Sequence, residues 1–174
     1  MRFEIDSAEV KRAKHPHEIF LLNLITNHVL LFIGVLMLSN TYPLLMLLVP
    51  AISFCVIGYL MNRARQSEQR DSWFVHLNWL LCLRRCKLFL VMLAVMSIVL
   101  FLGWLAIDVF EAQPVFVYAL SGAGILPVMV GVLVMILMES DALHQASQGR
   151  LPTNLVEQHP PPAEIKVIEE DRAP

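Results

Sequence analysis

The chain has 174 residues, of which 57% are hydrophobic and 16% are charged, and its formal net charge at pH 7 is −2. Soluble domains carry about 25% charged residues, so this composition argues against a mainly soluble protein and indicates a small polytopic membrane protein. The basic residues are too few, and too close to the apolar segments, to suggest a nucleic-acid partner. We expect an all-α membrane protein, a four-transmembrane-helix bundle made of two helical hairpins.

The first 18 residues are polar and of mixed charge, unlike the start of a secretory signal, and no small-residue cleavage site follows the first apolar run. We interpret them as a cytoplasmic N-terminal segment before a retained span. Four segments are long enough to cross about 30 Å of hydrocarbon, namely 19–39, 42–61, 88–107 and 115–138. Short connections pair them into hairpins, and Pro43 and Pro114 lie near the first turns of the second and fourth spans, where a missing N–H costs least.

The distribution of Lys and Arg predicts the orientation of these spans. All 13 basic residues lie in 1–18, in 62–87 or after residue 138, and the two hairpin turns hold none. By the positive-inside rule the basic side is cytoplasmic, so both termini are expected there. We expect a multi-pass protein of the plasma membrane, which is the inner membrane in a bacterial source.

The first span carries polar residues inside an apolar run, at Asn23, Thr26, Asn27 and His28. At 100° per residue the two asparagines and the threonine share one face, whereas His28 lies about 100° beyond Asn27. Polar groups at this depth bond other helices or mark a functional path. These four residues are the candidate intramembrane polar or interface residues. The alternative for His28 is a structural role, bonded to a backbone carbonyl or to Ser97.

Residues 62–87 begin with a polar link and continue with an apolar stretch that is too short to span. We expect residues 73–87 to form a separate helix lying in the membrane interface, where Trp and basic residues are enriched. The candidate residues for docking on the membrane surface are Trp73, Trp79, Arg84, Arg85 and Lys87.

Prolines and small residues shape the second and fourth spans. Pro50 and Pro127 are expected to kink these helices near their middles. Gly124, Pro127 and Gly131 fall on one stripe, where small residues let another helix approach closely, so they are the candidate helix-packing residues.

Residues of metal-ligating type gather near the cytoplasmic ends of the spans, but only His15 and His17 show a tight ligand spacing. The set consists of His15, His17, Glu18, His76, Glu139, Asp141 and His144. Their types suit a metal, yet we expect chance gathering at an interface rather than a metal site. We also expect no cofactor and no catalytic residue, and we interpret Cys55, Cys82 and Cys86 as small apolar filler.

The segment 139–174 is acidic and contains the run HPPP at 159–162, which predicts a mostly disordered cytoplasmic tail. Within it, 164–172 has the alternation needed to add a strand to a partner's sheet, or it is simply a solvated end. The expected function is that of a non-enzymatic subunit, or an assembly or scaffolding factor, of a larger membrane complex. The alternative is a small oligomeric transporter or channel with a polar path near Asn23, Asn27 and His28. The expected partners are membrane lipid and other membrane protein subunits or further copies of the chain.

Overall fold

The computed structural model describes residues 1–38, 41–109 and 114–169. It is about 82% helical, as the all-α prediction requires. In this described part, four helices are long and apolar enough to cross a membrane by length and composition, namely Ser7–Leu38, Leu44–Arg70, Trp73–Gly103 and Leu126–Ser147. The chain divides into two compact units, one made of Met1–Arg84 and Ile136–Pro174 and the other of Arg85–Met135.

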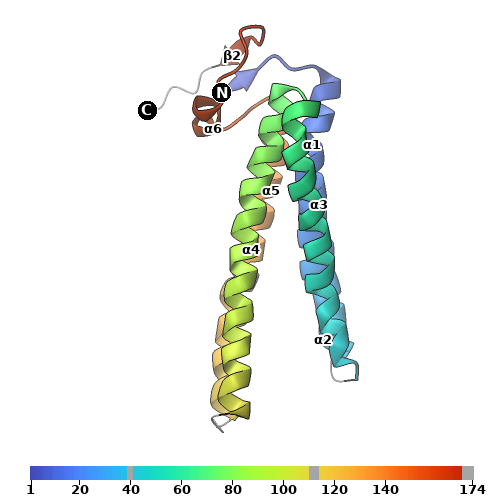
Figure 1. Ribbon diagram of the computed structural model, residues 1–174, viewed down its shortest axis with the longest axis vertical. Helices are drawn as coiled ribbons and strands as arrows, with labels where there is room; N and C mark the ends of the chain where they lie inside the picture. The colour runs from blue at the N-terminus through green and yellow to red at the C-terminus, as the bar shows by residue number, and fades with distance from the viewer. Residues whose placement is uncertain (39–40, 110–113, 170–174) are drawn as a thin grey trace. The chain divides into compact units, whose positions relative to one another are not determined.

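The first unit contains a hairpin of two long helical segments. One segment runs without a break through α1 (Ser7–Leu22), the π-helix η1 (Asn23–Leu31) and α2 (Phe32–Leu38), and the other through the 3₁₀-helix η2 (Pro43–Leu47) and α3 (Leu48–Arg70). Asp6 caps α1 by accepting a hydrogen bond from the N–H of Ala8 at 3.2 Å. The two segments lie side by side (Figure 1) and bury Phe20, Leu24 and Ile57.

Two features of α3 differ from the predictions. Pro50 falls in the first turn of α3 rather than at the middle of a helix, because the preceding five residues form a 3₁₀-helix. Its missing N–H therefore has no intrahelical partner to lose, and the expected kink at this position is wrong. The helix also continues through the predicted polar link as far as Arg70, since Arg, Gln and Glu are good helix formers.

The predicted interfacial helix is not a separate element. Helix α4 runs from Trp73 to Asp108 as one helix of 36 residues, so 73–87 and the third predicted span are continuous. Nothing in the sequence at the expected junction, such as Gly or Pro, would end a helix there. The break lies earlier, at Asp71 and Ser72, where the ion pair between Arg63 and Asp71 spans 2.6 Å.

The second unit contains the later part of α4 and the earlier part of α5 (Pro114–Ser147). Helix α5 begins at Pro114, as predicted. Of the predicted packing stripe, Gly131 lies against the side chain of Met92 in α4, so a β-carbon there would meet the end of that side chain. Pro127 lies inside α5 and is exposed, and Gly124 lies outside the described side chains.

Both ends of the described chain fold together into a small platform. Strand β1 (Arg2–Phe3) pairs antiparallel with β2 (Val167–Glu169), and the short helix α6 (Thr153–Gln158) lies between α5 and β2 in the chain (Figure 1). We call residues 1–6 and 148–169 the terminal platform. The prediction of a mostly disordered tail is wrong over 139–169, because α5 continues to Ser147 and because Leu151 and Leu155 are buried. Residues 170–174 lie outside the described part.

A glycine turn directs the chain from α5 into the terminal platform. Gly149 has a φ of +68°, and the N–H groups of Gly149 and Arg150 donate to the carbonyls of Ala146 and Gln145, as in a Schellman motif. The carbonyl of Gly149 then accepts from the N–H of Phe3 at 2.9 Å. A β-carbon at Gly149 would lie 2.7 Å from the carbonyl oxygen of Phe3, so only glycine fits both the turn and this contact.

Candidate functional site

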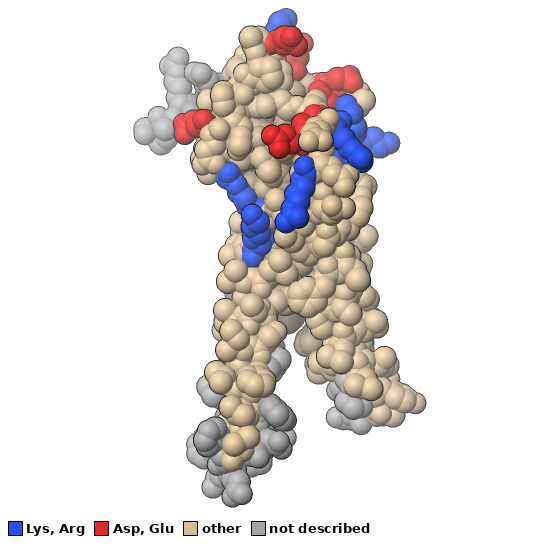
Figure 2. Space-filling view, in the orientation of Figure 1, with Lys and Arg blue, Asp and Glu red and all other residues tan. Residues whose placement is uncertain are grey.

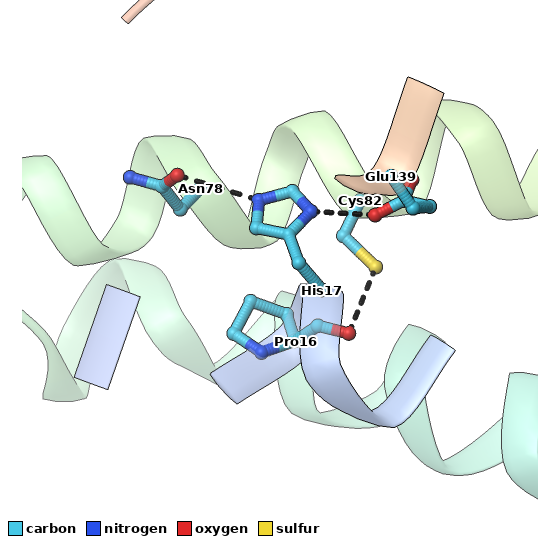
Figure 3. Close-up of polar contacts among 5 residues, drawn as sticks. All are labelled: Pro16, His17, Asn78, Cys82 and Glu139. Carbon is cyan, nitrogen blue, oxygen red and sulfur yellow. Dashed lines mark hydrogen bonds and ion pairs between the residues drawn. The ribbon is translucent and has the colours of Figure 1, made fainter. Parts of the chain in front are cut away.

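Four polar side chains meet in the interior of the first unit. His17 of α1, Asn78 and Cys82 of α4, and Glu139 of α5 point toward one another (Figure 3). His17 and Glu139 are 0% exposed, and Asn78 and Cys82 are each 1% exposed. We call these four residues the buried polar cluster. A buried carboxyl group and imidazole are costly unless they are paired, so this cluster is the most unusual chemistry of the described residues.

The hydrogen bonds of Asn78 determine the tautomer of His17. The side-chain amide of Asn78 donates from Nδ2 to the carbonyl of Phe74 at 2.9 Å, so its Oδ1 faces His17 Nε2 at 3.3 Å. An amide oxygen only accepts, so Nε2 carries a proton and donates it. The other ring nitrogen, Nδ1, lies 2.7 Å from Glu139 Oε2. Because two bare acceptors would repel at that distance, His17 and Glu139 share one further proton.

Cys82 completes the cluster with a sulfur donor. Its thiol donates to the carbonyl of Pro16 at 3.5 Å, and one ligand atom each from His17, Cys82 and Glu139 lies within 4.8 Å of the others. His17 and Glu139 belong to the set of metal-ligating types singled out in the sequence, although 122 residues separate them. Asn78 and Cys82 were missed as site residues. Their i, i+4 spacing, which places them on one helix face, was the available signal.

The other members of that sequence set have different surroundings. His15 packs edge-on against Trp79 with ring centroids 6.4 Å apart, and Glu18 pairs with Lys14 of its own helix at 3.6 Å. The remaining three residues bond to neighbouring side chains: His76 to Ser67, Asp141 to Gln145 and His144 to Gln148.

The asparagines of the first span join the two segments of the hairpin. Asn23 Nδ2 donates to Ser53 Oγ at 3.3 Å, and Asn27 Nδ2 donates to the carbonyl of Val49 at 2.9 Å and to Asn23 Oδ1 at 3.2 Å. Among the described residues, the buried Oδ1 of Asn27 has no hydrogen-bond partner. Thr26 is exposed and donates to the carbonyl of Leu22 in its own helix, so it does not share the role predicted for it with the asparagines.

His28 is buried and contacts the backbone of its own helix. It is 8% exposed, and its Nδ1 lies 3.4 Å from the carbonyl oxygen of Asn23, five residues earlier. The expectation of a separate face assumed α-helical winding, whereas Asn23–Leu31 is a π-helix with i→i+5 hydrogen bonds. Such segments are rare and are frequent at functional sites. The carbonyl contact agrees with the structural alternative, and Ser97 donates to the carbonyl of Leu93 in its own helix.

The two tryptophans predicted to lie at headgroup depth have structural contacts instead. Trp79 is 3% exposed, with the guanidinium of Arg63 5.0 Å from its ring centroid, so its assignment to a docking surface is wrong. Trp73 Nε1 donates to the carbonyl of His159 at 3.0 Å, and its ring packs edge-on against Phe3. Trp79 is buried and Trp73 is half-buried, because both supply large apolar area for packing.

The basic residues that follow these tryptophans differ among themselves. Arg84 donates to Gln158 of α6, Arg85 is half-buried, and Lys87 is exposed. A groove of about 270 Å³ lies beside Trp79 and is lined by charges of both signs, among them Arg12, Arg63 and Glu18.

The chain matches no family model, no curated protein and no solved structure. The described residues offer two candidate sites, the buried polar cluster and the polar segment of η1.

Proposed function

We propose that the protein is a non-enzymatic subunit, or an assembly or scaffolding factor, of a larger membrane complex. The observation that carries this proposal is the terminal platform, an ordered polar layer where the sequence predicted disorder. Its backbone bonds join Phe3 to Gly149, Glu4 to Lys166 and Leu151 to Met1. Folding two distant segments into one layer costs conformational entropy, and a rigid layer of this kind gives a partner protein a defined surface.

The arrangement of charge supports the same proposal. In the first unit, Lys, Arg, Asp and Glu side chains gather at the end that bears the terminal platform (Figure 2). The pairing of β1 with β2 supports a topology in which the two ends of the described chain lie on the same side of a membrane, as an even number of spans requires. Together with the positive-inside rule, this supports a plasma-membrane protein with both ends in the cytoplasm.

Outside this end, the candidate spans expose large apolar side chains, among them Leu30, Met37, Phe54, Val91, Leu133 and Leu137. Lipid is the natural partner of such a surface. We therefore assign separate roles to the helices and to the terminal platform. The helices hold the chain in lipid, and the terminal platform with the charged groove beside Trp79 meets another subunit.

The test is the native mass of the protein extracted gently from its own membrane. We expect co-purification with another membrane protein at a fixed ratio. A double variant of the platform, Glu157→Lys with Glu164→Lys, reverses two exposed charges and is expected to lose that partner while the chain still inserts. The control Arg65→Glu reverses an exposed charge on α3 and is expected to keep the partner. A homo-oligomer without other proteins would contradict the subunit proposal.

The second candidate is a small oligomeric transporter or channel, and η1 is the observation that favours it. A π-helix with the buried Oδ1 of Asn27 lacking a partner among the described residues is suited to a polar path. Proteoliposomes that swell in small polar solutes would support it, provided that His28→Ala abolishes the swelling and Thr26→Val does not. Equal swelling in both variants would remove η1 from any path.

A further inference from the structure

The buried polar cluster offers three different donor atoms to one point. His17 contributes a nitrogen, Cys82 a sulfur and Glu139 an oxygen, from three separate helices, and all three side chains are at most 1% exposed. Imidazole together with a thiolate selects late first-row metals, whereas Mg²⁺ and Ca²⁺ prefer oxygen ligands alone. Three protein ligands around one open position is also a common arrangement for Zn²⁺.

Asn78 supplies the second observation, because it orients His17 as the outer partner of a metal ligand does. Ligating histidines donate their other ring N–H to a fixed acceptor, which sets the tautomer and the direction of the bare nitrogen. Here Nε2 donates to Asn78 Oδ1, and Asn78 is itself held by the carbonyl of Phe74. Nδ1 is consequently the nitrogen that faces Glu139 and Cys82.

The charge balance of the cluster is the third observation. Without a metal, the cluster holds the proton shared by His17 and Glu139 and the thiol proton of Cys82, so its net charge is zero. A dication bound by a neutral imidazole, one carboxylate and one thiolate also has a net charge of zero. A buried site that stays neutral avoids the large cost of a charge transferred from water.

We propose that His17, Cys82 and Glu139 form a binding site for one late first-row divalent metal ion, with Zn²⁺ as the best match. This site goes beyond the proposed function, since one chain supplies every donor. A tetrahedral ion with bonds of about 2.0–2.3 Å holds its ligand atoms about 3.3–3.8 Å apart. The distance of 2.7 Å between His17 Nδ1 and Glu139 Oε2 must therefore increase when the ion binds, whereas the other ligand atoms, all within 4.8 Å of one another, are already near these distances.

The binding step releases two protons. One is the proton between Nδ1 and Glu139 Oε2, and the other is the thiol proton that Cys82 donates to the carbonyl of Pro16. Three new bonds form, from Nδ1, Sγ and a carboxylate oxygen to the ion, and no oxidation occurs. Because the donors are buried, the ion is loaded while the protein folds, so the test uses protein produced in cells supplied with zinc.

The first measurement is the zinc content of detergent-purified protein, produced without a chelator. The wild-type chain is expected to hold about one zinc ion, and Cys82→Ser and His17→Gln are expected to hold less than a tenth of that. The matched controls Cys55→Ser and His15→Gln change an exposed cysteine and an exposed histidine and should keep the metal. Wild-type protein with no more zinc than Cys82→Ser overturns the proposal.

A second measurement does not depend on whether a variant folds. Wild-type protein produced with Co²⁺ should show the absorption band of a thiolate-to-cobalt bond, and Cys55→Ser should show the same band. Folded wild-type protein that lacks this band overturns the proposal, and so does a band that Cys82→Ser retains. A band that is present in the wild type and lost only in Cys82→Ser and His17→Gln supports it.

Discussion

The pair formed by His17 and Glu139 allows a quantitative prediction for stability without metal. Both side chains are 0% exposed, and their polar atoms are 2.7 Å apart. Removing one partner of a buried pair costs about 3–5 kcal/mol, because the other is left unpaired in the interior. For Glu139→Leu we expect the lower end, about 3 kcal/mol, since His17 keeps its bond to Asn78. At 1.4 kcal/mol per tenfold, this is a loss of roughly 100-fold in the folding equilibrium.

The assay is SDS-titrated unfolding of the purified protein in mild detergent with a chelator present, followed by far-UV circular dichroism. A double-mutant cycle with His17→Phe isolates the pair from effects of volume. Because the double variant leaves no imidazole unpaired, its cost should fall below the sum of the single costs by about 2 kcal/mol, within the range seen for residues in contact.

Glu18→Leu is the matched control for this prediction. Glu18 also belongs to α1 and pairs with Lys14, but the two side chains are 49% and 33% exposed and 3.6 Å apart. Such surface pairs contribute about 0.5 kcal/mol or less. If Glu139→Leu costs no more than Glu18→Leu, or if the cycle shows no coupling, the reasoning about the buried pair is refuted.

Two further predictions concern the hairpin and the terminal platform. Asn27→Leu removes the bonds to the carbonyl of Val49 and to a neighbouring amide and should cost about 1–2 kcal/mol in SDS-titrated unfolding, whereas Thr26→Val should cost less than about 0.5 kcal/mol; equal costs would contradict the interhelical role. Gly149→Ala places a β-carbon against the carbonyl of Phe3 at a positive φ and should cost about 1–3 kcal/mol. The measurement is amide hydrogen exchange over residues 1–6, which should become faster in Gly149→Ala but not in the control Gly58→Ala. Unchanged exchange over residues 1–6 in Gly149→Ala would show that the turn tolerates a side chain.

The sequence predicted the helical elements well where length and apolar content decide them. Four long apolar helices and the start of α5 at Pro114 follow from local signals alone. The predictions that failed assumed regular geometry or few contacts. The face assigned to His28 rested on α-helical winding, whereas Asn23–Leu31 is a π-helix. The disorder predicted for the tail did not allow for the burial of a few apolar residues, such as Leu155, which stabilises a short segment.

The buried polar cluster lay beyond sequence reasoning for a different physical reason. His17 and Glu139 are 122 residues apart, and no spacing rule relates residues on different helices. Trp79 illustrates the same limit, since its type predicts a membrane interface but the guanidinium of Arg63 covers it. Local patterns therefore located the elements, whereas the partners of polar residues depend on packing between them.

The pairing of β1 with β2 has a consequence for biosynthesis. The N–H of Leu151 bonds to the carbonyl of Met1 across 150 residues, so at about 5–20 residues per second β1 waits roughly 8–30 s for this segment to be translated. Under the proposed topology, every span enters the membrane during that time. A chain with one span left out would place β1 and β2 on opposite sides, where they cannot meet, and Phe3 and Leu155 would stay uncovered. Under that topology, closure of this small sheet checks that insertion is complete, and a failure to close leaves an apolar surface that cellular quality control can recognise.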